Sequence, residues 1–288
     1  MKPEPECAGC MLTWLTERIA VSGHRSDWFP VVRSVAEMIG EGFYSTANMG
    51  LLANRSIELA GSLVAAAAAH FEKIKFGNNQ LAGNTLAAAN NFIENGKTPK
   101  AVFERACIVA AAGNVSPIGL PSRTPRFDEL EDIIEENSSL PAVIGDVHAA
   151  VGAASHILYI ADNSGEIGFD SLLLARLKEM GKRITMVVKE WPFFEDATQE
   201  DISFFGLDKI VDQVFTRNGF FVPADLPPQL QEVFEKSDLL ICKGTGNFEG
   251  LADETHGKNT IFMLKMKCGV IARRMGMKIG SFVVKLEK

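Results

Sequence analysis

The chain has 288 residues, 47% hydrophobic and 23% charged, so it can bury a large core and is neither disordered nor fibrous. Its 29 Lys and Arg against 36 Asp and Glu give a formal charge of −7, which argues against nucleic-acid or anionic-membrane binding through bulk positive charge. Five cysteines and a start without a secretory-signal pattern predict a soluble, reduced, cytoplasmic protein. The longest apolar stretch, 63–69, is far shorter than the roughly 20 residues of a membrane span.

The first part of the chain has a helical pattern. Stretches rich in alanine and leucine extend from Met11 to Ala112 and predict a bundle of helices. Glycine-containing breaks interrupt them at residues 23, 40–42, 77–79 and 96–99. Pro117, Pro121 and Pro125 then predict a connector, because such closely spaced prolines do not fit one regular helix, and an acidic run follows at 128–136.

The pattern changes after about residue 150. Short, nearly continuous apolar runs predict strands that are buried on both faces of a mostly parallel sheet. These runs lie at 156–160, 184–188, 238–242, 260–264 and 281–285. Helical patterns at 169–180 and 228–236 separate some of them. The second half therefore predicts an open α/β domain, whose ligands bind beyond the carboxyl ends of the strands.

Two of these predicted strands lead into carboxylates. Asp162 and Asn163 directly follow one strand, and Asp196 lies beyond the next. Hard divalent cations prefer oxygen ligands, so these three side chains are candidate metal ligands. Alternatively, Asp162 or Asn163 only caps the following helix. Glu166 and Asp170, one helical turn apart, either support the metal ligands or form a solvated acidic first turn.

A glycine-rich run follows the strand at 238–242. Lys243, Gly244, Gly246 and Asn247 resemble a phosphate cradle, in which backbone N–H groups and a lysine bind an anion. Neither the Walker A spacing nor Gly-x-Gly-x-x-Gly is present. Lys267, with a second lysine two residues before it, adds positive charge beyond the next strand; an exposed helix edge is the alternative.

Cys7 and Cys10 form a single Cys-x-x-Cys pair. It lacks the second half of a structural zinc site, so a metal completed by remote histidines and two thiols without function are both open. Neither His-Glu-x-x-His nor Gly-x-Ser-x-Gly occurs, which disfavours a zinc protease or a serine hydrolase of the α/β type.

The motifs Asp-Asn-x-Gly-Glu at 162–166 and Lys-Gly-x-Gly-Asn-x-Glu at 243–249, in this order, resemble those of the metal-dependent damage-control phosphatases. This family, formerly catalogued as a domain of unknown function, is also called the ARMT-like fold. The Cys-x-x-Cys pair is similar to the start of its short prokaryotic members, and the resemblance covers nearly the whole chain. Further similar elements are Lys75 with Asn79, Gly113-Asn114, and 264–268. Two departures are Ser116, in the segment where an aspartate is usual, and Ala69-His70-Phe71, where Asp-Pro-Tyr is typical.

The resemblance implies an α/β protein in which a helical N-terminal lobe, 1–150, packs on a Rossmann-like α/β/α lobe, 151–288, with a mostly parallel sheet. It implies a divalent metal, Mn, Co, Ni or Mg, at the same Asp162, Asn163 and Asp196. It also implies hydrolysis of phosphomonoesters of small metabolites, such as sugar phosphates or phosphorylated cofactor fragments, in metabolite damage control.

We therefore expect a metal-dependent phosphatase with Asp162, Asn163 and Asp196 as its catalytic and metal-binding residues. The expected substrate-binding residues are Glu166, Lys243, Gly244, Gly246, Asn247, Glu249, Lys267, Asn79 and Asn114. The alternative is a non-catalytic nucleotide- or anion-binding module. A covalent aspartyl-phosphate route predicts Asp-x-Asp after the first strand, whereas the sequence has Asp-Asn-Ser. The physiological substrate, the native metal and the oligomeric state do not follow from the sequence.

Overall fold

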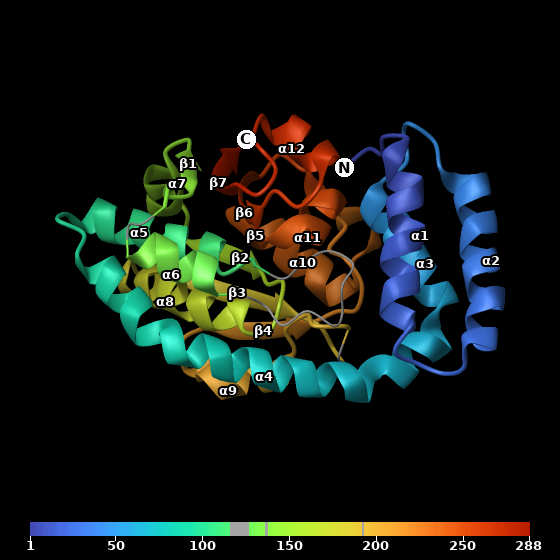
Figure 1. The fold of residues 1–288 in the computed structure, drawn as a ribbon. Coiled ribbons are helices and arrows are strands. Elements are labelled where there is room, and N and C mark those ends of the chain that lie inside the picture. Colours follow the sequence, from blue (N-terminus) through green and yellow to red (C-terminus); the bar gives the residue numbers. More distant parts are fainter. Residues whose placement is uncertain (116–126, 136–137, 192) are drawn as a thin grey trace.

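The computed structural model describes residues 1–115, 127–135, 138–191 and 193–288 (Figure 1). Three predicted connector prolines and the departure at Ser116 lie outside these ranges. Among the described residues, no helix has both the length and the apolar character that a bilayer span requires.

Helices make up the first part of the chain, as predicted. They are α1 (Glu6–Ile19), α2 (Arg25–Gly42), α3 (Met49–Leu59), α4 (Gly61–Glu94) and α5 (Pro99–Ala112). The break predicted at 77–79 is wrong, because α4 continues through it. A helix-interior glycine costs about 1 kcal/mol, and Asn78 and Asn79 are buried in tertiary contacts that offset this cost. In Figure 1, α4 extends along the molecule from the α1–α3 group to α5.

Seven strands form one sheet. They are β1 (Ala142–Ile144), β2 (His156–Ile160), β3 (Arg183–Val188), β4 (Gln213–Thr216), β5 (Leu239–Lys243), β6 (Asn259–Lys265) and β7 (Phe282–Glu287). Their spatial order is β1-β7-β6-β5-β2-β3-β4, and only the β6–β7 pair is antiparallel among these neighbours. The five predicted strands are confirmed. The edge strands β1 and β4 were not predicted, because their apolar runs are only two or three residues long and these strands are only partly buried.

The strand order reverses between β2 and β5. From β2 the chain builds β3 and β4 on one side, and it then returns to build β5 and β6 on the other side. The segments that leave β2 and β5 therefore diverge at the carboxyl edge, and such a point of divergence opens the crevice in which α/β sheets bind ligands.

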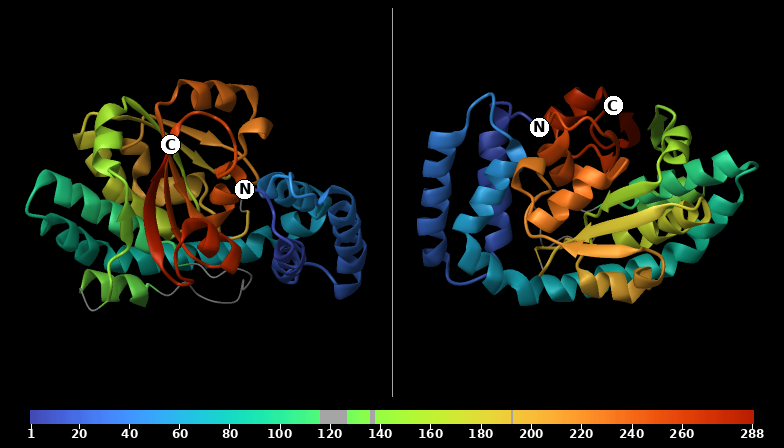
Figure 2. Two further views of the ribbon diagram at one scale, coloured as in Figure 1. Left: turned by 90° about the horizontal axis from the view of Figure 1, so that it is seen from above. Right: turned by 180° about the vertical axis from the view of Figure 1, so that it is seen from behind.

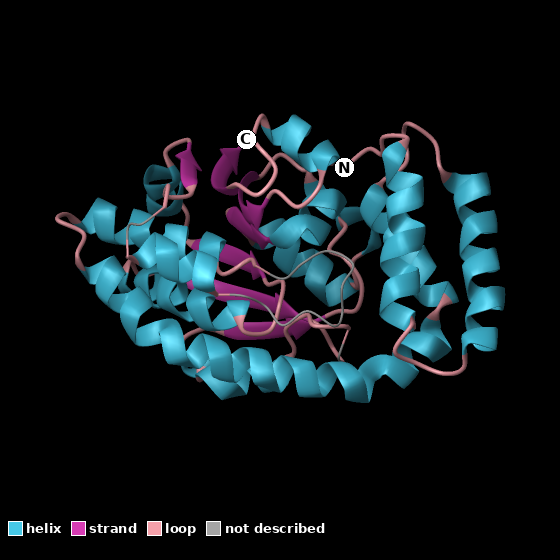
Figure 3. Cartoon of the chain, in the orientation of Figure 1, coloured by secondary structure: helices cyan, strands magenta, loops and turns pink. Residues whose placement is uncertain are grey.

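The remaining helices connect the strands and cover the sheet (Figure 3). They are α6 (Asp128–Ile134), α7 (Val147–Ala153), α8 (Glu166–Glu179), α9 (Gln199–Phe205), α10 (Pro228–Lys236), α11 (Gly244–Leu251) and α12 (Gly269–Met275), with short 3₁₀ turns at Leu207–Lys209 and Pro223–Asp225. The predicted helix at 228–236 is confirmed, and the one predicted at 169–180 begins earlier, at Glu166. The run predicted as a glycine-rich cradle is the start of α11, apart from Lys243.

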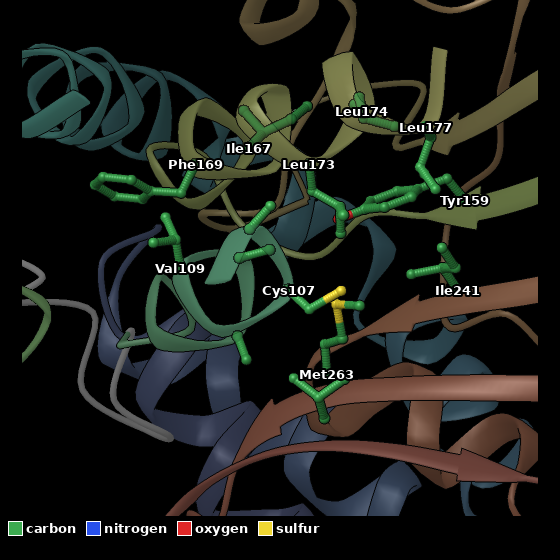
Figure 4. Packing of buried hydrophobic residues seen from close by; sticks show 14 of the residues in the cluster. Cys107, Val109, Tyr159, Ile167, Phe169, Leu173, Leu174, Leu177, Ile241 and Met263 are labelled. Carbon is green, nitrogen blue, oxygen red and sulfur yellow. The ribbon is translucent and has the colours of Figure 1, made fainter. Parts of the chain in front are cut away.

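Side chains of the central strands alternate between two apolar cores. Tyr159, Ile241 and Met263 belong to the core shared with α5 and α8 (Figure 4). Leu158 and Leu240, their neighbours along the chain, belong to the core shared with α1–α3. Because both faces of these strands are buried, their sequences are almost uniformly apolar.

The division of the chain near residue 150 remains a prediction. Strand β1 precedes that position and pairs with β7, and α5 packs against α8, β6 and β7. All views place α1–α3 together at one end of the molecule, beside the sheet (Figure 2).

Gly50 of α3 offers a test of the packing between the N-terminal helices and α11. A Cβ at Gly50 would lie 2.7 Å from the Cα of Gly250 and 2.7 Å from Cγ2 of Val222. We expect Gly50→Ala to lower the free energy of unfolding by about 1–3 kcal/mol in urea titrations, because the two backbones must separate. The matched control is Gly83→Ala in α4, which meets no atom within 4 Å and should stabilise by about 0.5–1 kcal/mol. Equal effects of the two substitutions would contradict this packing.

Candidate active site

A pocket of about 220 Å³ lies at the carboxyl ends of the central strands. Its wall on the sheet side includes Asp162, Asn163, Glu195, Asp196, Thr245, Gly246, Glu249, Lys267 and Cys268, which follow β2, β3, β5 and β6. The volume is below the roughly 300–1,000 Å³ of pockets for drug-sized ligands, so the pocket suits a small metabolite. It coincides with the reversal of strand order between β2 and β5.

The segments that follow β2 and β3 run side by side in this pocket. Asn163 and Asp196 form an antiparallel bridge, and the backbone N–H of Ala197 donates to the carbonyl of Asp162 at 2.8 Å. The structure therefore brings Asp196 next to Asp162 and Asn163, the other two predicted metal ligands, which lie more than thirty positions earlier in the sequence. Their role as metal ligands remains a prediction.

Two carboxamides hold the Asp162 and Glu166 carboxylates. Asn114 Nδ2 donates to Asp162 Oδ2 and to Glu166 Oε2, both at 2.8 Å. Asn163 Nδ2 donates to the same two oxygens at 2.7 and 2.9 Å. Because Asn163 Nδ2 is engaged in these hydrogen bonds, its carboxamide oxygen is the side-chain atom that could bind a cation. The oxygen of Asn114 accepts from the backbone N–H of Lys265, which ties β6 to this cluster.

The carboxylates of the site carry strongly perturbed pKa values. Burial, together with the nearby Glu166 and Asp196, raises the pKa of Asp162 to about 7. Burial also raises the pKa of Asp196 to about 6, although Lys189 Nζ lies 3.3 Å from Asp196 Oδ2. Burial lowers the pKa of Lys267, against the attraction of Asp162. Negative charge is therefore crowded at this end of the pocket, where a cation would be stabilised.

Gly244 allows β5 to approach this cluster closely. Its φ is +76°, and a Cβ at this position would overlap the Asp162 carboxylate. Only glycine adopts such a conformation readily and leaves this space free.

Lys243 has no exposed surface and lies behind the pocket wall. Its Nζ is 2.8 Å from Glu166 Oε1 and 2.7 Å from Asp170 Oδ1, and it donates to the carbonyl of Ala110. Although burial favours the neutral forms, this pairing lowers the pKa of Glu166 and raises the pKa of Lys243. Burial raises the pKa of Asp170 to about 6. The ammonium expected to bind phosphate is thus engaged by two carboxylates.

Helix α4 supports the same loops from the other side. Lys75 Nζ donates to Thr198 Oγ1 at 2.6 Å and lies 2.8 Å from Asp201 Oδ2. Asn79 donates to Asp201 at 2.7 Å and accepts from the backbone N–H of Gly165 at 2.7 Å. Asn79 therefore positions the loops after β2 and β3 and is not among the residues lining the pocket.

Three of the nine predicted substrate-binding residues line the pocket: Gly246, Glu249 and Lys267. Burial raises the pKa of Glu249 to about 7. Asn247 donates to the carbonyls of Ala161 and Lys243 and so braces the ends of β2 and β5. The remaining residues, Glu166, Lys243, Gly244, Asn79 and Asn114, support the walls in the ways just described.

The opposite wall was not predicted as part of the site. It is one face of α1, with Cys7, Cys10, Met11, Trp14 and Arg18. Cys268 lies in the same pocket, and burial raises the pKa of the Cys10 thiol to about 11. Across the ranges that the structure describes, no group of three or more His, Cys, Asp and Glu side chains is placed to hold a metal ion. The cysteine pair therefore gains no support as a second metal site.

Known proteins are similar to this chain in fold and in sequence. A family model described as "Damage-control phosphatase ARMT1-like domain" matches residues 5–283. The chain is 31% identical to "Damage-control phosphatase" of Archaeoglobus fulgidus over 221 residues, which are 75% of each protein. It is 34% identical to "Damage-control phosphatase PH1575" of Pyrococcus horikoshii over 192 residues, which are 65% of this chain and 66% of that protein. The crystal structure of PH1575, described as a DUF89 family protein, has a TM-score of 0.80 over 100% of both chains at 26% identity. The predicted fold class and family are confirmed, whereas similarity to short prokaryotic members through the Cys-x-x-Cys pair stays a prediction.

The buried ion pairs of Lys243 generate a stability prediction. Lys243→Met should lower the free energy of unfolding by about 3–5 kcal/mol, because Glu166 and Asp170 remain buried without their cation. Denaturant titrations measure this change. The matched control is Lys236→Met, which removes an exposed pair with Glu232 and should change stability by less than about 1 kcal/mol. A loss at Lys243 no larger than the loss at Lys236 would contradict the structural role.

Because the pKa of Asp162 is raised, we expect that removing its charge increases the stability of the fold by an amount that depends on pH. The folded chain binds this proton more tightly than the unfolded chain, whose Asp titrates near 3.8, so this group lowers stability as the pH rises from about 4 to 7. In EDTA at about pH 8, Asp162→Asn should raise Tm by about 2–4 °C, the shift produced by about 1 kcal/mol. The gain should shrink toward pH 4, whereas the exposed control Asp208→Asn should show no such trend. A difference in Tm between Asp162→Asn and the wild-type protein that does not change with pH would contradict a raised pKa of Asp162.

Proposed function

Because the chain belongs to the damage-control phosphatase ARMT1-like domain family, we propose that it hydrolyses phosphomonoesters of small metabolites with a divalent metal ion as cofactor. The supporting observation is the convergence of Asp162, Asn163 and Asp196 in a pocket of metabolite size at the strand-order reversal. The proposed substrates are sugar phosphates or phosphorylated cofactor fragments, and the proposed metals are Mn, Co, Ni or Mg.

The residues at this end of the pocket fit such an ion. Asp162 and Asp196 offer carboxylates and Asn163 a carboxamide oxygen, which are ligands that hard divalent cations prefer. The pKa of Asp162, raised to about 7 by burial and by its acidic neighbours, reflects negative charge that a divalent ion would balance. When bound, such an ion polarises a phosphoryl oxygen and makes a nearby water more acidic.

The chain itself supplies anion binding next to this trio. Lys267 lines the pocket with Thr245 and Gly246, which lie in the first turn of α11. The N-terminus of a helix favours an anion through its free N–H groups and its dipole, and the lysine adds positive charge. Phosphoryl transfer requires mainly positioning and charge neutralisation, so these groups suit the phosphate of the substrate.

We assign Asp196 the orientation of the attacking water. Its Oδ2 lies 3.3 Å from Lys189 Nζ, which holds the carboxylate in place. The buried Lys243 acts through Glu166: it fixes the carboxylate to which Asn114 and Asn163 donate, and so fixes the side chains that flank Asp162.

Replacement of Asp162 tests the proposal. Asp162→Ala should lower metal-stimulated kcat/KM for a generic phosphomonoester by more than about 100-fold, since several kcal/mol of charge stabilisation are lost. A thermal-shift titration with Mn²⁺ provides a readout independent of activity: the rise in Tm of the wild-type protein over EDTA should disappear in the variant.

The matched control is Asp208→Ala, which removes an exposed carboxylate from the 3₁₀ turn at Leu207–Lys209 and should keep both the activity and the metal-dependent shift. Full activity of Asp162→Ala would contradict the proposed metal site. Ligand binding that is indifferent to divalent metal, without hydrolysis, would favour a non-catalytic anion-binding module instead.

A further inference from the structure

The face of α1 that lines the pocket has no part in the phosphate chemistry proposed above. Cys7, Met11, Trp14 and Arg18 follow one another at intervals of four, three and four positions, as one helical face requires. This face lines the same pocket as the segments that follow the strands, and its Arg18 reaches Glu195, the residue before Asp196.

Arg18 is held in a buried position. Only 7% of the residue is exposed, although it lines the pocket. Its guanidinium carbon lies 5.1 Å from the centre of the Trp14 ring and 5.3 Å from that of the Phe194 ring. Both distances are in the range of cation–π contacts, so two aromatic rings fix the guanidinium in place.

Glu195 faces Arg18 without forming a hydrogen bond to it. The closest atoms, Arg18 Nη2 and Glu195 Oε1, are 3.6 Å apart, beyond the usual N–H···O range. Glu195 is 7% exposed and directly follows Phe194, whose φ of +56° is unusual for a bulky residue. Backbone strain of this kind is common at functional sites, and here it places a ring under Arg18 and a carboxylate beside it.

The two side chains leave one donor and one acceptor unused. Within the described part of the chain, Arg18 Nη1 and Glu195 Oε2 are buried and have no hydrogen-bond partner. Buried polar atoms are nearly always paired, so each unpaired atom requires an explanation. A guanidinium nitrogen only donates, and a carboxylate oxygen only accepts.

We propose that Arg18 and Glu195 form a specificity-determining pair that binds a hydroxyl group on the alcohol moiety of the substrate. A hydroxyl is both acceptor and donor, so it accepts from Arg18 Nη1 and donates to Glu195 Oε2 and pairs both atoms at once. A second anionic group would satisfy Arg18 but would meet the Glu195 carboxylate, which disfavours it. The inference rests on the proposed function, because the hydroxyl group belongs to the same substrate whose phosphate that function places in this pocket.

The test compares phosphomonoesters that differ only in hydroxyl groups. Glycerol phosphate and sorbitol 6-phosphate are paired with n-propyl and n-hexyl phosphate, and kcat/KM is measured with Mn²⁺ for each. The wild-type protein should prefer at least one polyol phosphate over the alkyl phosphate of equal length. Arg18→Gln and Glu195→Gln should each reduce this preference by about 10- to 100-fold, the contribution of a hydrogen bond to a charged group, and chiefly through KM.

The control is Arg33→Gln, whose side chain is 80% exposed and which should leave the preference unchanged. A wild-type preference near unity, or an equal loss for polyol and alkyl substrates in both variants, overturns the inference and leaves the proposed function standing. Absence of hydrolysis of every probe by the wild-type protein overturns both. If one variant does not fold, as judged by thermal unfolding, the other variant decides the question.

Discussion

The pairing of Asn163 with Asp196 is the contact on which the rest of the site depends. It joins the segments that leave β2 and β3, and so places two carboxylates from different strands at the same end of one pocket. Burial, with repulsion from the nearby Glu166 and Asp196, raises the pKa of Asp162 to about 7, so keeping this carboxylate ionised costs free energy. A fold that keeps such a pairing must hold the two segments together by other means.

Buried lysines and carboxamides provide those means. Lys243 pairs with Glu166 beneath the β2 segment, Lys189 pairs with Asp196, and Lys75 pairs with Asp201 on α9. Buried ion pairs of this kind contribute little net stability, because desolvation offsets their attraction, but breaking one is costly. Their effect is therefore to make a single arrangement of the loops much better than its alternatives, and catalysis needs side chains held in one geometry.

Local patterns in the sequence predicted the central strands, and they predicted that Asp162, Asn163 and Asp196 lie close together, because each of these residues follows a recognisable strand. Uniformly apolar runs identify strands buried on both faces, and the topology of parallel sheets brings their carboxyl ends together. The alternation of side chains along a strand also predicts the face on which the Lys243 side chain lies. Lys243 is two positions after Ile241, which faces α5 and α8, so it points to the same side. There its ammonium contacts the carbonyl of Ala110 and the carboxylate of Asp170. The motif indicated the residue types but not the face on which each side chain lies.

The wall formed by α1 could not be predicted in this way, because no local pattern relates Arg18 to Glu195, 177 positions later. Between the two parts of the chain lies α4, which at 34 residues is about 50 Å long and extends from the α1–α3 group to α5. Lys75 and Asn79 fix the middle of this helix to the loops after β2 and β3. One long helix thus contacts the loops that hold the carboxylates and also leads to the helices that face them, while α3 packs directly against α11. The position of the α1 wall relative to the carboxylates therefore depends on tertiary contacts and not on a local sequence pattern.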